Sequence, residues 1–367
     1  MTRFLKLSLL FALCLSMFVM NGALAATVDV GIVLPTREES RWLGDEAMFK
    51  KAIEEGNYNA RILFSETNSA TEKSNVETLL GLGAKVIVLC AFDATAAAAA
   101  VDMAAAEGAD VISYDRLIMD TDKLSYYVTF DSIKVGEAQA KYLVNQVEPG
   151  SKGNNLYIYS GALTDNNSFL FFEGAWNILQ PYIADGTFTV QNSAKAVEYM
   201  DKPELTREEK AALMGAIDTE WKMNVSKSLA EAHLTTAGED AKGTVFVLGP
   251  ADDDCCRALS DAFHADAQVK KVHITGADGV ASSVQYIIDG KQSMTVYKDP
   301  QALVDATFTI IEALFAGQEP ETNAVYNNNA MDVPTIQCDV VTVTADNIAE
   351  VFFDTGVYNG DDYTNWK

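Results

Sequence analysis

The sequence predicts an α/β protein with two similar lobes, each built around a sheet of parallel strands. β-type and helical runs alternate regularly from residue 28 onward, as they do when a covering helix follows each strand. The alternation restarts after residue 131, which indicates a second unit of the same kind. A chain of 367 residues is also too long for one ordinary core, so each half is expected to bury its own.

The elements of the first lobe follow from the spacing of apolar residues. Residues 28–34 are almost all apolar, as in a strand covered on both faces, and helical spacing follows over 42–55. The Ala-rich run at 94–106 is predicted to be helical from propensity alone. The other elements expected here are strands at 61–65, 86–90, 111–114 and 126–130, and a helix at 70–82.

The second lobe is predicted from the same rhythm. Asp131 and Ser132 are expected to cap a helix over 135–147, and a turn cluster follows at 148–153. The charged, helix-prone stretch 198–220 breaks the rhythm and is predicted to be a surface insertion. The remaining expectations are strands at 156–159, 188–190, 245–248, 272–274 and 294–297, helices at 169–183, 223–234, 258–264, 280–288 and 302–315, an Asn-rich loop at 326–329, a strand-like run at 333–343 and a short helix at 345–353.

Residues 1–26 have the composition of a secretory signal peptide. Arg3 and Lys6 make the start positive, an apolar run follows, and Ala23-Leu24-Ala25 matches an A-x-A cleavage site. The apolar run is too short for a membrane span. We therefore expect an exported periplasmic protein, with cleavage near Ala25-Ala26.

Charge and cysteine content exclude several classes of function. A formal net charge of -25 and a pI near 4.4 argue against nucleic acid or an anionic membrane as a partner. The cysteines beyond the signal match no zinc pattern, so no metal or cofactor is expected. Whether these cysteines pair stays open, although Cys90 at the end of a strand is predicted to be an inert buried thiol. They are Cys90, Cys255, Cys256 and Cys338.

Asp115 and Arg116 directly follow the predicted strand at 111–114. Ligands of doubly wound sheets bind just beyond the carboxyl ends of the strands. A carboxylate beside a five-donor guanidinium suits a ligand covered in hydroxyls, such as a sugar. Taken alone, an Asp-Arg pair is more often a surface ion pair that closes a loop.

Similar polar groups recur at the ends of other predicted strands, which favours a binding site over isolated surface charges. Asp93 is expected to cap the Ala-rich helix, and single members of the Asp165–Asn167 and Asp252–Asp254 runs could also be caps. Aromatic rings that stack on sugar faces, together with planar groups that bind vicinal hydroxyls, make up a carbohydrate site. The residues that recur in this way are Arg41, Trp42, Asp93, Asn167, Trp221, Asp252, Asp278 and Lys298.

An enzyme is the alternative from another class. Asp115, Asp252 and Asp278 could converge as the carboxylates of a glycoside-processing enzyme. Arg116 would keep Asp115 ionised, however, which disfavours a proton donor there. The sequence has no nucleophile elbow, P-loop or H-E-x-x-H motif, and its three histidines sit beside no plausible nucleophile. No catalytic residue is therefore expected.

The residues carry a resemblance to a known family, the periplasmic sugar-binding proteins of ABC transporters. The similarity is to its xylose-binding and multiple-monosaccharide (glucose/galactose) branch, and it spans nearly the whole chain after the signal. The motifs that carry it are Ser40-Arg41-Trp42, Ser113-Tyr-Asp-Arg-Leu-Ile118, Phe130-Asp131 with Val135-Gly136, Thr164-Asp-Asn-Asn167, Gly276-Ala-Asp278, Thr295-Val-Tyr-Lys-Asp299 and Asp332-Val-Pro334.

The resemblance implies periplasmic binding protein type I architecture, in which a three-segment hinge joins the lobes. The N-terminal lobe would be 27–131 plus 299–334, and the C-terminal lobe 132–298 plus 335–367. A monosaccharide of the xylose, glucose or galactose class would bind between them and pass to an ABC permease. A chemoreceptor or histidine kinase is the alternative partner, and a monomer is expected. The implied sugar contacts are Arg41, Asp115, Arg116, Asn167, Trp221, Asp278 and Lys298, with Trp42 and Asp93 as neighbours and Asp252 as an additional ligand.

The sequence departs from the family pattern at two places that bear on which sugar is bound. Where the family often has Asn-Asp after the strand at 245–248, this chain has Ala251-Asp252, so one amide contact is expected to be lost. The Pro that often follows the family's tryptophan is missing after Trp221.

Overall fold

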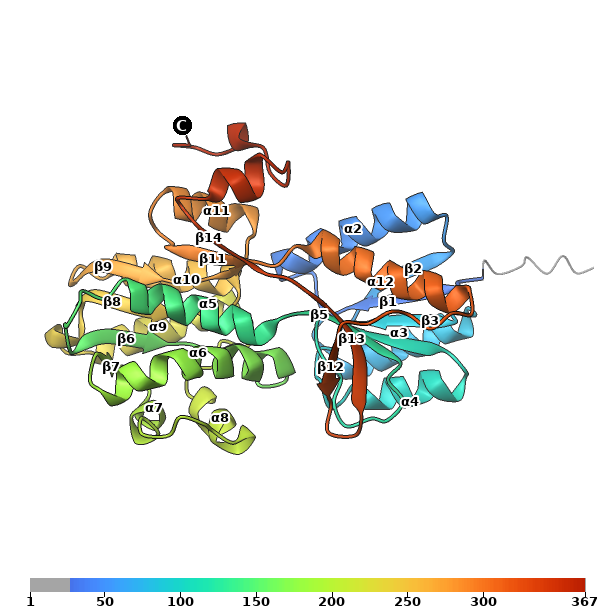
Figure 1. The fold of residues 1–367 in the computed structure, drawn as a ribbon, viewed down its shortest axis with the longest axis horizontal. Coiled ribbons are helices and arrows are strands. Elements are labelled where there is room, and N and C mark those ends of the chain that lie inside the picture. The colour runs from blue at the N-terminus through green and yellow to red at the C-terminus, as the bar shows by residue number, and fades with distance from the viewer. Residues whose placement is uncertain (1–26, 367) are drawn as a thin grey trace, which may run out of the picture.

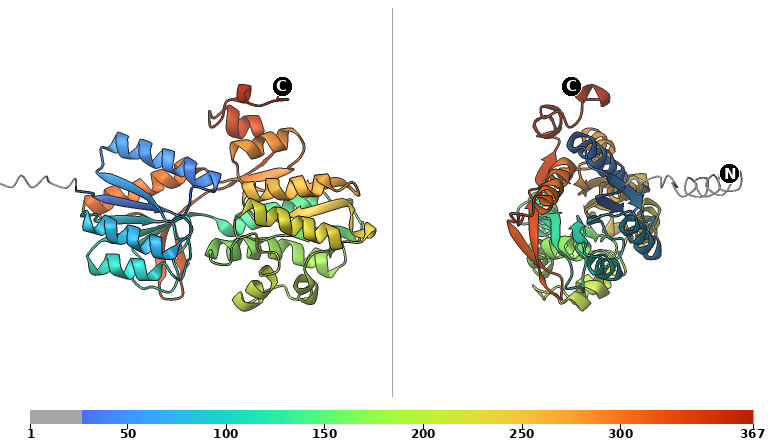
Figure 2. Two further views of the ribbon diagram at one scale, coloured as in Figure 1. Left: turned by 180° about the vertical axis from the view of Figure 1, so that it is seen from behind. Right: turned by 90° about the vertical axis from the view of Figure 1, so that its right-hand side faces the viewer.

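The structure, a computed structural model, describes residues 27–366 as two lobes that lie side by side (Figure 1). The expected signal peptide at 1–26 lies outside the described residues. Three segments of chain pass between the lobes at a narrow waist, and the view from behind shows the same division (Figure 2).

The N-terminal lobe is a sheet of 7 strands in the order β12-β13-β5-β4-β3-β1-β2, parallel except for β12. Side chains alternate across it: Val30 and Ile32 pack on the face covered by α2 and α12, whereas Val33 packs on the face covered by α3 and α4. The two cores explain the continuous apolar strands. The elements are β1 (Val30–Leu34), α2 (Ser40–Gly56), β2 (Ala60–Phe64), α3 (Ser69–Gly81), β3 (Val86–Leu89), α4 (Ala98–Ala106), β4 (Asp110–Tyr114), β5 (Tyr126–Phe130), α12 (Pro300–Phe315), β12 (Ala324–Asn327) and β13 (Asp332–Cys338).

The C-terminal lobe has a parallel sheet of 4 strands, β7-β6-β8-β9, and a smaller sheet of 3 strands, β10-β11-β14. Helices cover both faces of the larger sheet, as Figure 1 shows. The predicted two-lobed α/β fold is confirmed. The elements are α5 (Ser132–Asn145), β6 (Asn154–Ile158), α6 (Asn166–Ala184), β7 (Phe188–Val190), α7 (Ala194–Glu198), α8 (Arg207–Met214), α9 (Met223–Thr236), β8 (Gly243–Leu248), α10 (Asp253–Ala265), β9 (Val269–Ile274), β10 (Ala277–Asp278), α11 (Ala281–Ile288), β11 (Met294–Tyr297) and β14 (Val341–Thr344).

The chain crosses between the lobes after β5, after β11 and after β13. The third crossing lies later than the expected boundary at 334. β13 stays paired with β5 through Cys338↔Phe130, and the chain joins the C-terminal lobe only when Val341 pairs with Tyr297. The strand-like run at 333–343 is therefore two strands in two sheets, and the expected Asn-rich loop begins within a hairpin formed by β12 and β13.

The sequence predicted that the stretch 198–220 is a surface insertion, and this prediction is wrong in part, because the stretch also contributes to the core. It holds α8, which begins with a capping box between Thr206 and Glu209. Leu213, Met214 and Ile217 are fully buried against the core beside α6. Most charged residues of the stretch are exposed. Its overall composition is therefore that of a surface segment, although one side of it is apolar and buried.

The end of the chain packs on α11 and β14 and stands above the C-terminal lobe in Figure 1. The expected helix at 345–353 is a short π-helical turn, Ala349–Phe353, which buries Phe352 against Tyr297. Tyr358 then donates to the carbonyl oxygen of Gly279 at 2.9 Å. This segment thus supports the turn that follows β10.

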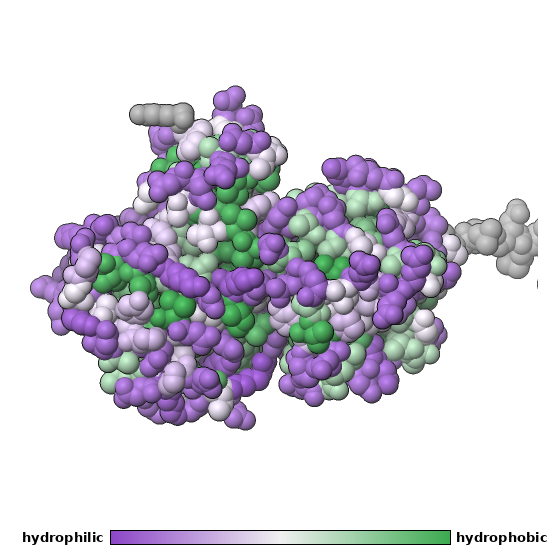
Figure 3. All heavy atoms as spheres, in the orientation of Figure 1, coloured by the Kyte–Doolittle hydropathy of each residue, from purple (hydrophilic) through white to green (hydrophobic). Residues whose placement is uncertain are grey.

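Polar side chains cover most of the face shown in Figure 3, as expected from the acidic composition. Over the described range 27–366, no helix combines the length and the apolar character needed to cross a membrane. The cysteines in this range are free, and Cys90, Cys255 and Cys256 are buried. The predicted burial of Cys90 is confirmed.

Candidate functional site

The N-terminal lobe presents the first part of the site at the start of α2. Glu39 precedes the helix, and its carboxylate accepts from Trp42 Nε1 at 2.8 Å instead of capping the backbone. Arg41 is buried and pairs with Asp45 one turn along, Nε to Oδ2 at 2.6 Å. Asp45 also accepts from the hydroxyl of Tyr114. These contacts hold the Arg41 guanidinium in place at the edge of the sheet.

Asp115 and Arg116 follow β4 directly, as the sequence predicted, and both are buried. Arg41 Nη2 lies 3.2 Å from Asp115 Oδ2. Arg116 Nη2 lies 3.5 Å from Glu39 Oε2, and its guanidinium carbon is 5.1 Å from the centre of the Trp42 ring. The first and fourth strands therefore place two guanidinium groups around one indole ring.

The start of α6 faces these groups from the C-terminal lobe. Asp165 caps the helix by accepting from the backbone of Asn167 at 2.9 Å. Asn167 Nδ2 donates to the carbonyl oxygen of Asp115 at 2.8 Å, across the cleft. Phe171 is four residues further along the helix and so shares a face with Asn167. One helix end thus contributes a carboxylate, an amide and an aromatic ring.

Trp221 and Asp252 come from two loops of the C-terminal lobe. Trp221 is partly buried between α8 and α9, and its Nε1 donates to Asp165 at 3.2 Å. Its ring lies against Gly161, where an added Cβ would come within 1.9 Å of the indole. Asp252 caps α10 by accepting from Cys255 N at 2.6 Å.

Asp278 ends β10 and Lys298 directly follows β11, and these two strands are neighbours in the small sheet. Lys298 Nζ lies 2.7 Å from Asp278 Oδ1, and Arg41 Nη1 from the other lobe lies 3.4 Å from the same oxygen. All three side chains are buried. Asp278, in the C-terminal lobe, therefore binds both a hinge residue, Lys298, and a residue of the N-terminal lobe, Arg41.

Four residues of the site have left-handed backbone conformations that non-glycine residues rarely adopt: Asp115 (φ 62), Trp221 (φ 56), Ala251 (φ 47) and Asp278 (φ 101). Each such residue costs about 1–3 kcal/mol and persists only where its surroundings require it. Their convergence on one cavity marks the region as functional.

These side chains line a single small cavity between the lobes. Nine of the ten sugar-binding residues expected from the sequence are in its wall. Asp93 is the exception: it lies outside the wall, and its Oδ1 accepts from Thr95 N and Ala96 N. It caps the start of a turn that precedes α4, and α4 itself begins only at Ala98.

The sequence reasoning missed four residues of the wall. Glu39 could have been found from its place between β1 and Arg41, and Phe171 from its helical spacing after Asn167. Asp165 was assigned only a possible capping role, although its second oxygen binds Trp221 and Arg116. Nothing in the sequence indicated that Ala251, whose side chain is a single methyl group, would line the cavity. The four missed residues are Glu39, Asp165, Phe171 and Ala251.

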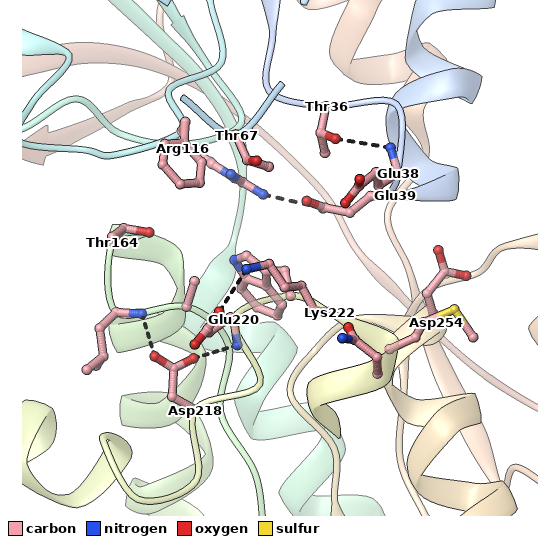
Figure 4. Close-up of a pocket in the computed structure, with 16 residues that line it drawn as sticks. Thr36, Glu38, Glu39, Thr67, Arg116, Thr164, Asp218, Glu220, Lys222 and Asp254 are labelled. Carbon is pink, nitrogen blue, oxygen red and sulfur yellow. Dashed lines mark hydrogen bonds and ion pairs between the residues drawn. The ribbon is translucent and has the colours of Figure 1, made fainter. Parts of the chain in front are cut away.

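A larger cavity of about 480 Å³ opens outward from the same site (Figure 4). Glu39 and Arg116 lie on its N-terminal side, facing Asp218, Glu220 and Lys222 of the other lobe. Glu39, Arg116 and Trp221 line both cavities. The outer cavity falls within the range of small-molecule pockets, whereas the inner one, at about 20 Å³, has room for about one water molecule.

The inner cavity is small because the lobes are in direct contact. Arg116 Nε lies 3.0 Å from Asp165 Oδ2 across the cleft. Ser40 N donates to Asp254 Oδ2 at 3.0 Å, and Ala94 N donates to Thr164 O at 2.9 Å. Charged and polar groups of the two lobes thus satisfy one another where a polar ligand would take their place.

The electrostatics of the site depend on these pairs. Burial alone would raise the pKa of Asp115, but Arg41, Lys298 and Arg116 hold it below its usual value. This agrees with the prediction that Asp115 stays ionised. Burial raises the pKa of Glu39 to about 7 in spite of Arg116. The site can therefore bind hydroxyl groups, but Asp115 is not suited to donate a proton.

No cluster of potential metal ligands occurs among residues 27–366. A polar, tryptophan-lined site between two hinged α/β lobes defines a solute-binding protein. The chain belongs to the family described as periplasmic binding protein domain, whose model matches residues 30–319. The resemblance found in the sequence is confirmed.

The similarity to relatives and to solved structures covers nearly the whole chain. The multiple sugar-binding periplasmic receptor ChvE of Rhizobium radiobacter is 30% identical over 98% of this chain and 99% of its own. The D-xylose-binding periplasmic protein of Escherichia coli K12 is 28% identical over 96% and 97%. A carbohydrate transporter solute-binding protein from Chloroflexus aurantiacus, solved in complex with D-glucose, is 51% identical with a TM-score of 0.91, covering 93% and 99%.

Proposed function

We propose that this protein captures a monosaccharide between its lobes and delivers it to an ABC permease. The observation that carries the proposal is the convergence of Arg41, Asp115, Arg116, Asn167 and Asp278 on one cavity walled by two tryptophans. Planar guanidinium, carboxylate and amide groups bind vicinal hydroxyls in pairs, and the indole rings contact the apolar face of the sugar. The protein is thus a binding protein and not an enzyme.

Glucose is the first sugar to test, with xylose and galactose next. A solved structure that is 51% identical to this chain holds D-glucose, and relatives at 28–30% identity are named for xylose or for multiple sugars. All the residues proposed to contact the sugar, except Asp93, lie in the cavity wall.

The mechanism proposed is hinge closure in the periplasm. The sugar takes the place of the contacts between Arg116 and Asp165 and between Arg41 and Asp278, and so bridges the lobes. The permease recognises the closed form, in which the two lobes have come together on the sugar. The protein acts as a monomer in this mechanism. A chemoreceptor or sensor kinase would read the same closed form, so a signalling role is compatible with this mechanism.

The test is a thermal-shift and calorimetric titration of residues 27–367 with glucose, xylose, galactose, arabinose and ribose. A sugar at a hundredfold excess over its Kd should add about 2.7 kcal/mol to the free energy of unfolding. Arg116→Ala should weaken binding by about a hundredfold or more, because it leaves Asp165 and Glu39 without their cation.

Arg61→Ala is the matched control, since Arg61 is exposed on β2 away from the cavity. It should leave the Kd unchanged. Unchanged melting curves with all five sugars would refute the proposed function.

A further inference from the structure

The turn that follows Asp278 is held by residues that do not line the inner cavity. Asp253, the first residue of α10, accepts from Gly279 N at 2.8 Å and from Val280 N at 3.1 Å. Its other oxygen accepts from Thr295 Oγ1 at 3.1 Å. Asp253 and Thr295 are both fully buried. A buried carboxyl group thus fixes the backbone directly after Asp278.

The C-terminal segment 349–363 holds the same turn through the carbonyl group of Gly279. The hydroxyl of Tyr358 donates to Gly279 O at 2.9 Å. The ring of Phe352 packs directly against Gly279, because a Cβ added there would lie 2.9 Å from Phe352 Cζ. The segment stands above the C-terminal lobe in Figure 1, and none of its residues lines the inner cavity. Both polar backbone groups of Gly279 therefore have partners outside the cavity wall.

These contacts bear on the site because Asp278 has a backbone conformation that non-glycine residues rarely adopt, with a φ of 101. Such a conformation persists only where its surroundings require it. The same backbone decides where the carboxylate lies, and its Oδ1 is 2.7 Å from Lys298 Nζ and 3.4 Å from Arg41 Nη1. A shift of about 1 Å away from these groups would take Oδ1 out of hydrogen-bond distance of both.

We propose that Tyr358 is a positioning residue for sugar binding, because it holds the turn after Asp278 and so keeps the Asp278 carboxylate where the sugar meets it. The inference rests on the proposed function and adds to it a residue that lies outside the cavity. The C-terminal segment then sets the affinity for the sugar without touching it. Asp253 holds the N–H side of the same turn, so loss of the Tyr358 hydroxyl releases only one side and leaves the fold intact.

The test is a calorimetric titration of residues 27–367 with whichever of the five sugars binds most tightly. It is made at pH 8, since burial and the nearby Asp278 raise the pKa of Asp253 to about 7, and Asp253 is then largely ionised. Tyr358→Phe should weaken binding by about five- to tenfold, which corresponds to the loss of one hydrogen bond.

A double-mutant cycle separates the positioning of Asp278 from a general effect on the fold. In an Asp278→Asn background, Tyr358→Phe should weaken binding by about twofold or less, because the carboxylate that Tyr358 positions is already gone. Thermal shifts at high sugar concentration measure the weaker Kd values.

Tyr286→Phe is the control variant, because the hydroxyl of Tyr286 on α11 donates to Asp261 and not to the turn. It should leave the Kd unchanged in both backgrounds. An unchanged Kd in Tyr358→Phe would overturn the inference, as would an equal loss in the two backgrounds. If the unmodified protein binds none of the five sugars, the proposed function itself fails, and this inference fails with it.

Discussion

Glu72 is a fully buried acid behind the cleft, with no ion-pair partner among residues 27–366. Its carboxylate accepts from Phe92 N at 2.8 Å, and Phe92 lines the outer cavity. Burial is the largest influence on its pKa, which rises from 4.5 to about 7. The acid therefore holds a segment of the cleft wall and is neutral in mildly acidic solution.

Glu72→Gln should flatten the dependence of stability on pH. The folded pKa of Glu72 is higher than the unfolded one, so its contribution is fully present below pH 4.5 and is lost as the pH rises to about 7. At about 1.4 kcal/mol per pKa unit, the loss is about 3 kcal/mol. Gln keeps the acceptor for Phe92 N but does not ionise, so the loss of stability between pH 4.5 and 7, measured from urea unfolding curves, should be smaller in this variant by about 3 kcal/mol.

Glu77→Gln is the control at the same scale, because Glu77 is exposed on the same helix. It should keep the pH dependence of the unmodified protein. If Glu72→Gln also keeps that dependence, Glu72 is not the acid responsible.

At the scale of elements, α5 and α6 pack closely because each has a glycine at their crossing. A Cβ added to Gly136 would lie 1.9 Å from the carbonyl oxygen of Phe171, and one added to Gly174 would lie 2.1 Å from that of Ile133. Both obstacles are backbone atoms, which cannot rotate away. Since Phe171 lines the inner cavity, this crossing also positions the site.

Gly136→Ala should destabilise the protein by about 3 kcal/mol, at the upper end of the usual cost of overpacking, and weaken sugar binding by displacing Phe171. Chemical denaturation and calorimetry measure the two effects. Gly81→Ala is the matched control, since Gly81 ends α3 with no atom within 4 Å of the added methyl group. It should leave binding unchanged and raise stability by at most about 1 kcal/mol. Equal stability of the two variants would contradict this account of the crossing.

At the scale of the whole molecule, three narrow connections leave the lobes free to rotate, and the contacts across the cleft are those of the closed arrangement that a bound sugar would stabilise. The contacts of Arg116 with Asp165 and of Arg41 with Asp278 are ionic, and the hydroxyl groups of a sugar can replace them. We expect the radius of gyration measured by small-angle X-ray scattering to decrease when a saturating sugar is added. Arg116→Ala should abolish the decrease. A radius that is identical with and without a bound sugar would rule out hinge closure.

The sequence by itself determined the two-lobed fold and most of the cavity wall. The periodicity of strands and helices is a property of the local sequence. The runs at 28–34 and 126–130 therefore indicate strands, whichever other strands they pair with. Asp115, Asn167 and Lys298 follow strands or open helices, and parallel strands bring such positions to one edge of a sheet. The motifs of the sugar-binding family then identified which of these polar residues belong together.

Only the tertiary structure decided the features that depend on contacts between residues far apart in the chain, namely strand pairing, burial and the placement of side chains in the cavity wall. The run at 333–343 divides between two sheets because β13 pairs with β5 and β14 with β11. The stretch 198–220 buries Leu213 and Met214 because α6 offers an apolar surface, which its charged composition did not reveal. Asp93 turned out to cap a turn, while Glu39 and Phe171 entered the cavity wall. Side-chain direction and pairing across the cleft are set by packing between residues far apart in the chain, and local patterns do not record that packing.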